Sequence, residues 1–131
     1  MSSPEAWLRA TIETAAGATA WPVAVSDSAT LPFAVYSRES TERPLQTSGL
    51  TGFADGEFSL EVCGASWTSA RAAADAIVAA VQNFSGTGQG AIIDHVHDSA
   101  DRDGTAVYLT DGQDMPSYFV IELQIFIRWR E

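Results

Sequence analysis

The segment Y-F-V-I-E-L-Q-I-F-I-R-W-R, from Tyr118 to Arg130, decides the fold of this chain. Every second side chain in the segment is apolar: Phe119, Ile121, Leu123, Ile125, Ile127 and Trp129. Such alternation is typical of a β-strand with one buried face. Burying the six side chains would contribute roughly 9–18 kcal/mol. We therefore expect this strand to lie at the centre of a sheet.

The opposite face of this strand mixes polar and apolar side chains. Tyr118, Val120 and Phe126 share it with charged residues, including Arg128 and Arg130. Apolar side chains on the second face of a strand need cover, which a helix or a neighbouring subunit can supply. Arg128 and Arg130 suit either of two roles: they protect the sheet against unwanted strand addition, or they pair with acidic residues of an adjacent subunit.

Length and composition bound the class of protein. The chain has 131 residues, of which 46% are hydrophobic, so we expect one domain over residues 1–131 with its own core. Its net charge of −10 opposes direct binding to nucleic acid or anionic membranes, and the expected partners are proteins or cations. The single Cys63 argues against a disulfide framework, and no N-terminal apolar run indicates a signal peptide or a membrane span. We expect a soluble protein that is made in the cytosol.

Periodicity elsewhere predicts two helices and several strands. One helix runs from Ser3 to Gly17, and a second begins at Ser66 or Thr68 and ends near Asn83. The other expected elements are, in order, a covering loop over 18–32, a strand over 33–39, a long connection over 40–57, a strand over 57–63, a glycine-rich turn over 85–90, a strand over 91–98, and an acidic loop over 98–116 with a short strand at 105–109. The predicted fold is a two-layer α+β domain, in which a mainly antiparallel sheet of about four to five strands carries two helices on one face.

Two further features suggest contact with other subunits. The second helix carries alanine where a solvent-facing side would carry charge, at Ala72, Ala76 and Ala79. Alanine is a good helix former, and its small side chain also lets another backbone come close. The connection over 40–57, which includes Arg43, is long for a compact domain and is expected to become ordered against a partner.

Candidate catalytic and metal-binding residues are few. His95 and His97 point to the same side of a strand, but two ligands fall short of a metal site, so we interpret them as surface or interface residues. Residues 99–104 imitate the spacing of a calcium loop but lack its first carboxylate and its flanking helices, which favours a solvated acidic loop. No nucleophile, base and oxyanion donor occur together, and Cys63 is expected to be a partly buried residue. We predict no catalytic residue, no metal and no cofactor.

Three segments, taken in order, resemble one protein family. They are L-P-F-A-V-Y-S-R-E-S at 31–40, F-S-L-E-V-C-G-A-S-W-T-S-A-R-A-A-A-D-A-I-V-A-A-V at 58–81, and Y-F-V-I-E-L-Q-I-F-I-R-W-R at 118–130. Together they resemble the small tail-completion, or tail-terminator, proteins of long-tailed bacteriophages and prophages over residues 4–131. The chain departs from that family at Cys63 and Gly64, where a more polar pair is usual, and in its acidic stretch around 98–114.

The resemblance implies an α+β fold without catalytic residues and assembly into a ring, commonly a hexamer, that caps the tail tube and joins it to the head connector. The implied partners are other copies of the chain, the tail tube protein and a head connector or neck protein, with no membrane. DNA would pass through the ring without sequence-specific binding, because ten negative charges per copy keep it from adhering. The implied location is the tail or neck of a virion, after assembly in the host cytoplasm. The candidate interface residues are Ala72, Ala76, Ala79, Arg43, Tyr118, Phe126, Arg128 and Arg130.

Two other functions fit the sequence. One is a different neck component, such as a head-completion or stopper protein with a similar ring architecture. The other is a small ligand- or metal-binding regulatory domain that would use His95, His97 and the acidic loop. Such a domain would be a monomer that binds its ligand with micromolar affinity.

Overall fold

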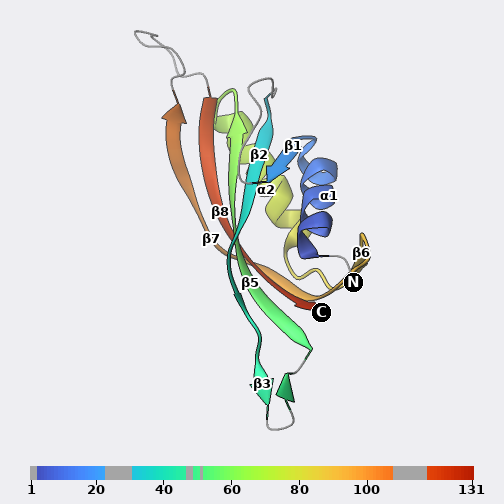
Figure 1. Cartoon of the computed structure of the whole chain (residues 1–131). Coiled ribbons are helices and arrows are strands. Elements are labelled where there is room, and N and C mark those ends of the chain that lie inside the picture. The colour runs from blue at the N-terminus through green and yellow to red at the C-terminus, as the bar shows by residue number, and fades with distance from the viewer. Residues whose placement is uncertain (1–2, 23–30, 47–48, 51, 108–117) are drawn as a thin grey trace.

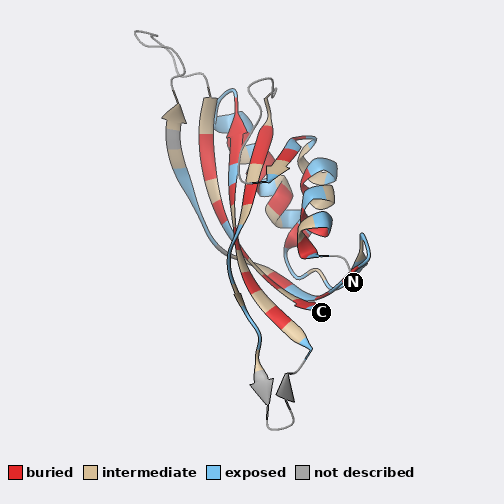
Figure 2. Ribbon diagram, in the orientation of Figure 1, coloured by how far each residue is buried: buried red, intermediate tan, exposed pale blue. Residues whose placement is uncertain are grey.

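The apolar C-terminal strand, β8 (Tyr118–Arg130), lies inside a six-stranded sheet with the order β1-β2-β5-β8-β7-β6. It pairs antiparallel with β5 (Phe53–Gly64) on one side and with β7 (Ala91–Val107) on the other. Its inward side chains are at most 3% exposed from Ile121 to Trp129, and Figure 2 shows buried residues alternating with mostly half-buried ones along β8 and β5. The central position predicted from the alternation is confirmed.

The computed structural model describes residues 3–22, 31–46, 49–50, 52–107 and 118–131. Its remaining elements, shown in Figure 1, are α1 (Pro4–Ala16), β1 (Thr19–Pro22), β2 (Phe33–Glu42), β3 (Leu45–Gln46), β4 (Gly49–Leu50), α2 (Trp67–Val81) and β6 (Gly86–Gly88). The strands predicted over 33–39, 57–63 and 91–98 are therefore confirmed as parts of β2, β5 and β7.

Both predicted helices form where their capping residues indicate. Ser3 is the N-cap of α1, and Gly17 closes it in the left-handed conformation with φ 64°. The Ser66 hydroxyl accepts a hydrogen bond from the backbone N–H of Ser69, so Ser66 and not Thr68 caps α2. In the described part of the chain, neither helix is long and apolar enough to cross a membrane.

The predicted two-layer domain with four to five strands is wrong. The described chain contains eight strands: six form one sheet, and β3 and β4 form a separate two-stranded ribbon. β1 pairs parallel with β2, so the sheet is mixed, and Figure 1 shows that it curls along its length. α1 packs against α2 and also contacts both β1 and β7, which lie toward opposite edges of the sheet.

The error in strand number comes from short strands inside segments predicted as loops or turns: β1 over 19–22, β3 and β4 over 45–46 and 49–50, and β6 over 86–88 in the predicted glycine-rich turn. Residues 40–42, 53–56 and 99–104 lengthen strands that were predicted, and the short strand predicted at 105–109 is, over 105–107, the end of β7. β1 is too short to show a period, and the stretches over 40–42 and 101–103 carry polar side chains on both sides of their strands. The alternation in β7 is also broken by register shifts between Ile93 and His95, Asp98 and Ala100, and Asp103 and Ala106. Within these predicted connections, residues 23–30, 47–48, 51 and 108–117 lie outside the described residues.

Gly64, at the end of β5, touches the first turn of α2. A Cβ atom at this position would lie 2.6 Å from the Ala70 nitrogen and 2.9 Å from the Ala70 Cα. These are backbone atoms, so no side-chain rotation relieves the contact and the helix would have to shift. We expect Gly64→Ala to lower the free energy of unfolding by about 1–3 kcal/mol in urea denaturation.

The neighbouring Ala65 provides the control for this prediction. Ala65 is exposed, and Ala65→Ser should change the free energy of unfolding by no more than about 0.5 kcal/mol. If both proteins unfold at the wild-type urea concentration, the close approach of β5 to α2 is not required for stability.

Candidate interaction surfaces

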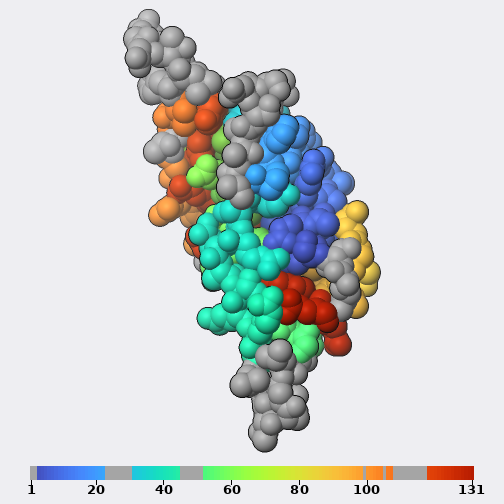
Figure 3. Space-filling view, in the orientation of Figure 1, coloured from blue at the N-terminus to red at the C-terminus, as the bar shows by residue number. Residues whose placement is uncertain are grey.

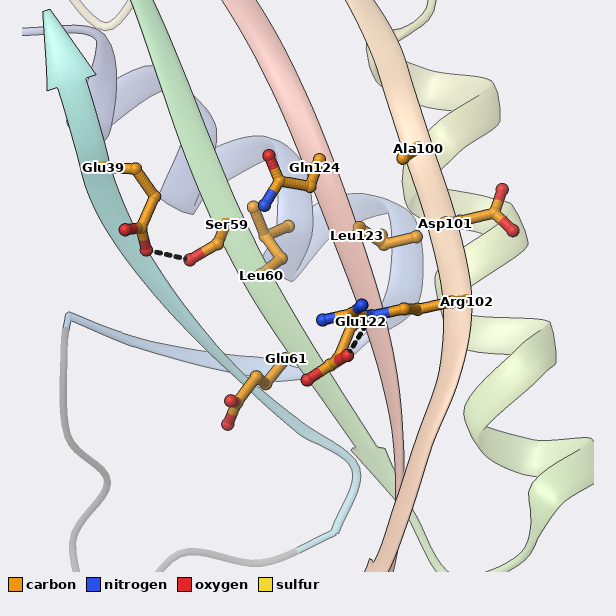
Figure 4. A pocket seen from close by; sticks show the side chains of 10 residues that line it. All are labelled: Glu39, Ser59, Leu60, Glu61, Ala100, Asp101, Arg102, Glu122, Leu123 and Gln124. Atoms are coloured by element: carbon orange, nitrogen blue, oxygen red, sulfur yellow. Dashed lines mark hydrogen bonds and ion pairs between the residues drawn. The ribbon is translucent and has the colours of Figure 1, made fainter.

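The outer face of the sheet, which is the face turned away from α1 and α2, is hollowed and acidic. Figure 4 shows the hollow, of about 480 Å³, where side chains of β2, β5, β8 and β7 surround it. Glu39 accepts hydrogen bonds from the hydroxyls of Ser59 at 2.6 Å and Ser37 at 3.1 Å, and these bonds lower the pKa of Glu39. Arg102 forms an ion pair with Glu122 on the same face.

Four carboxylates of this outer face lack a cationic partner among the described residues: Glu39, Glu42, Glu57 and Glu61. Two hollows place Glu42 and Glu57 beside Glu39, and Glu39 beside Glu61. The face therefore presents a continuous negative surface along β2 and β5, which attracts cations or basic protein segments and repels phosphate.

Arg128 and Arg130 lie near the end of β8 and are engaged within the chain. Arg128 donates two hydrogen bonds to Asp55 of β5, at 2.6 and 3.0 Å. The Arg130 guanidinium lies 4.8 Å from the centre of the Phe53 ring. Because β8 is an interior strand, these arginines do not protect a sheet edge. Their pairing with an adjacent subunit stays a prediction.

Arg43 is likewise held inside the chain. Its guanidinium donates to both carboxylate oxygens of Glu131, at 2.6 and 2.9 Å, and the pair joins the end of β2 to the C-terminus. Six of the seven arginines form ion pairs within the chain: Arg9, Arg38, Arg43, Arg71, Arg102 and Arg128. Few cations therefore remain for contacts between copies of the chain.

The alanine side of α2 is a second surface, separate from the outer face of the sheet. Ala72 and Ala79 are exposed, and Ala76 is half-buried. Beside them, Ala80 lines a shallow hollow of about 400 Å³ with Trp7 and other residues of α1 and β6. The small side chains of the exposed alanines would allow another backbone to pack closely against α2, as the sequence suggested.

Tyr118 and Phe126, the aromatic candidates of β8, are both half-buried by their own chain. Tyr118 packs edge-on against Phe33 at 5.5 Å, within a small cluster that covers this end of the outer face. Phe126 is stacked by His97 at 4.9 Å with an interplanar angle of 27°. Phe33 and His97 of the same chain therefore shield part of the apolar surface of Tyr118 and Phe126.

The candidate metal ligands are not brought together. The His95 and His97 rings lie 5.4 Å apart, and no group of three potential ligands occurs among the described residues. Asp101 and Asp103, predicted to be in a solvated loop, belong to β7 and pair with Arg71 of α2 at 3.4 and 2.7 Å. That loop interpretation is wrong, because an arginine on α2 neutralises these carboxylates in a strand.

Asp98 is a perturbed group that the sequence pattern did not reveal. Its Oδ1 atom is buried without a hydrogen-bond partner in the described part of the structure, while its backbone N–H donates to Gln82 at 2.8 Å. Burial and the neighbouring Asp101 carboxylate raise the pKa of Asp98. A raised pKa means that the folded chain holds the proton more tightly than the unfolded chain, so stability falls as pH rises from the ordinary pKa through the raised one.

We therefore expect Asp98→Asn to raise the melting temperature at neutral pH, because asparagine carries no charge to desolvate. The gain should disappear below about pH 3.9, where the aspartate is also protonated. Thermal denaturation across this pH range measures the effect. The exposed Asp94 of the same strand is the control, and Asp94→Asn should leave the melting temperature at neutral pH nearly unchanged, because it replaces a side chain that is not buried. A lower melting temperature for Asp98→Asn at neutral pH would mean that the carboxylate makes a favourable contact.

Cys63 is 2% exposed and lies in the same small cluster as Phe33 and Val120. Burial, with a smaller effect from Glu61, raises the pKa of its thiol to about 12. The thiol is therefore protonated at neutral pH and inert as a nucleophile, and Cys63 is more deeply buried than the sequence pattern predicted.

These surfaces define a domain that presents an acidic sheet face and a smooth helix face. No protein-family model and no curated protein sequence matches the chain. Among solved structures, the chain is similar to one in the virion of a native gene transfer agent (GTA) particle, with a TM-score of 0.63 and 15% sequence identity. The match covers 95% of this chain and 84% of that chain. At this identity the likeness shows a shared fold.

Proposed function

We infer that this chain is a structural protein of a phage-like virion, and that it serves there as a tail-completion protein. The observation that carries the inference is the fold shared with a chain of the GTA virion over 95% of the present chain. The resemblance to tail-terminator proteins rests on three segments in order and extends over residues 4–131. The fold match supports the coarse role, and the resemblance supports the position at the tail.

In this proposal several copies of the chain, expected to be six, close into a ring on the tail tube and join it to the head connector. The alanine side of α2 supplies a contact between copies, since its small side chains allow close packing. The outer face of the sheet lines the channel, where its unpaired carboxylates keep passing DNA from adhering. The protein would be assembled in the host cytoplasm and remain at the neck of the virion.

Particles produced without this chain test the proposal. Electron microscopy should show overlong tails or tails that are not joined to heads. Without the ring, nothing would stop growth of the tail tube or bind the tube to the head connector. Filled heads that leak DNA would instead assign the chain to head completion as a stopper. Normal particles with joined tails of wild-type length would overturn the proposed function.

A further inference from the structure

The sheet has an open edge along the second half of β2. β1 pairs with residues 33–36 of β2 only, so residues 37–42 pair with β5 on one side and with no described strand on the other. Figure 3 shows this part of β2, in teal, running uncovered along the surface. After the register shift between Arg38 and Ser40, residues 40–42 form a regular run.

A second open edge lies along the second half of β7. β6 pairs only with residues 91–93, and the end of α2 covers the next stretch, where Asn83 N–H donates to the Val96 carbonyl and Asp98 N–H to Gln82. From Ala100 onward no described strand pairs with this side of β7. Residues 100–103 form a regular run between two register shifts. Open strand edges are templates for pairing with another chain.

The directions of the strands let these two edges pair with each other in successive copies. β2, β5, β8 and β7 alternate in direction, because each neighbouring pair is antiparallel. The β2 strand of a second copy, placed beside β7 of the first in the same orientation, is therefore also antiparallel. Contact between two different surfaces of identical chains is heterologous, and such contacts generate rings when the rotation closes.

The positions of the two open runs match the tilt that a closed sheet needs. Glu42 pairs with Asp55 of β5, which pairs with Arg128 of β8, whereas Ala100 of β7 pairs with Gln124 of β8. Measured along β8, the two open runs are therefore offset by 128 − 124 = 4 residues. An offset of four residues is a shift of about 13 Å along the strands. From β2 of one copy to β2 of the next there are four strand spacings, or about 19 Å across the sheet. The resulting tilt is about 35°, within the range of roughly 35–45° found in closed barrels.

The two runs contain one cation, Arg102, which pairs with Glu122 of its own copy and also comes near carboxylates of the facing copy. In this alignment Thr41 lies opposite Asp101, and Ser40 lies opposite Arg102. Glu39 and Glu42, which have no cationic partner among the described residues, then flank Arg102 on the outer face. Opposite charges at neighbouring positions stabilise an antiparallel strand pair.

We propose that residues 40–42 of one copy pair with residues 100–102 of the next, so that the sheets of all copies join into one continuous barrel around the channel. This contact rests on the ring proposed above and names the backbone surfaces that close it. The occupant of each open edge is a second copy of this chain.

Paired cysteines test the contact. Glu42→Cys combined with Ala100→Cys places two exposed positions opposite each other between copies, and Glu42→Cys combined with Arg102→Cys tests the adjacent register. Oxidation of at least one of these proteins should give a ladder of covalent multimers on a non-reducing gel. The native Cys63 does not compete, because it is buried and its thiol pKa is raised to about 12.

Each single-cysteine variant is the control and should give no ladder, because the facing strand then lacks its thiol. Covalent dimers from a single variant would indicate a two-fold contact and overturn the proposal. Native mass spectrometry of the reduced proteins separates the remaining outcomes. A ring mass without a ladder in either double variant overturns the edge contact and leaves the proposed function standing, whereas a monomer mass without a ladder overturns the contact and the ring together.

Discussion

Replacing Phe58 by alanine is expected to lower the free energy of unfolding by about 3–5 kcal/mol, the largest loss of any single substitution considered for the monomer. Phe58 is fully buried in β5 and lies opposite Ile125 of β8. The Trp129 ring meets it edge-on at 6.2 Å, and the Arg38 guanidinium lies 5.5 Å from its ring centre. Removing the ring leaves a cavity where the two central strands meet the core. Urea denaturation measures the loss, with one common value for the dependence of the free energy of unfolding on urea concentration.

Phe126 is the matched control for this substitution. It lies on the outer face of β8, half-buried beneath His97, so Phe126→Ala removes the same ring without opening the core. We expect a loss of about 1 kcal/mol, in the range of substitutions outside the core. Equal losses for the two substitutions would mean that the core does not lie on the α1 and α2 side of the sheet.

Replacing Ala79 by glutamate is expected to reduce the mass of the assembled protein to that of one chain. Ala79 is exposed on α2, so the monomer should keep its melting temperature, while the new charge enters the close contact proposed between copies. Ala76 is half-buried, and a glutamate there would disturb the fold as well. Light scattering for mass and circular dichroism for melting distinguish the two effects.

Ala79→Ser keeps the side chain small and uncharged and serves as the control, with an unchanged mass. A ring of wild-type mass in the Ala79→Glu protein would exclude the alanine side of α2 from the interface. A lowered melting temperature in that protein would show instead that Ala79 contributes to the packing of the monomer.

The sequence predicted those parts of the fold in which one period dominates. The six apolar side chains of β8 define an inner face, and Ser3 and Gly17 delimit α1, because each of these signals is local. The stretch over 100–103 carries charge on both sides of β7, since Asp101 and Asp103 pair with Arg71 on one side and Arg102 pairs with Glu122 on the other. No local period marks such a strand, and its pairing with β8 is visible only in three dimensions.

The candidate surfaces were predictable to a similar degree. Ala72 and Ala79 follow from helical periodicity, and the structure leaves both exposed. The partners of Arg43 and Arg128 depend on residues 88 and 73 positions away in the chain, so sequence spacing could not reveal them. The acidic outer face needed the strand register, which aligns carboxylates of β2 and β5 that are distant in sequence.

The central claim is that copies of this chain assemble into a closed ring, and the mass of the wild-type protein in solution tests it most directly. Light scattering and native mass spectrometry over a series of protein concentrations, with and without purified tail tubes, give this mass. The account predicts one discrete species with a mass several times the 14.0 kDa of a single chain, six times for the expected hexamer. A mass of 14.0 kDa at every concentration, with no ring on tail tubes, would contradict it.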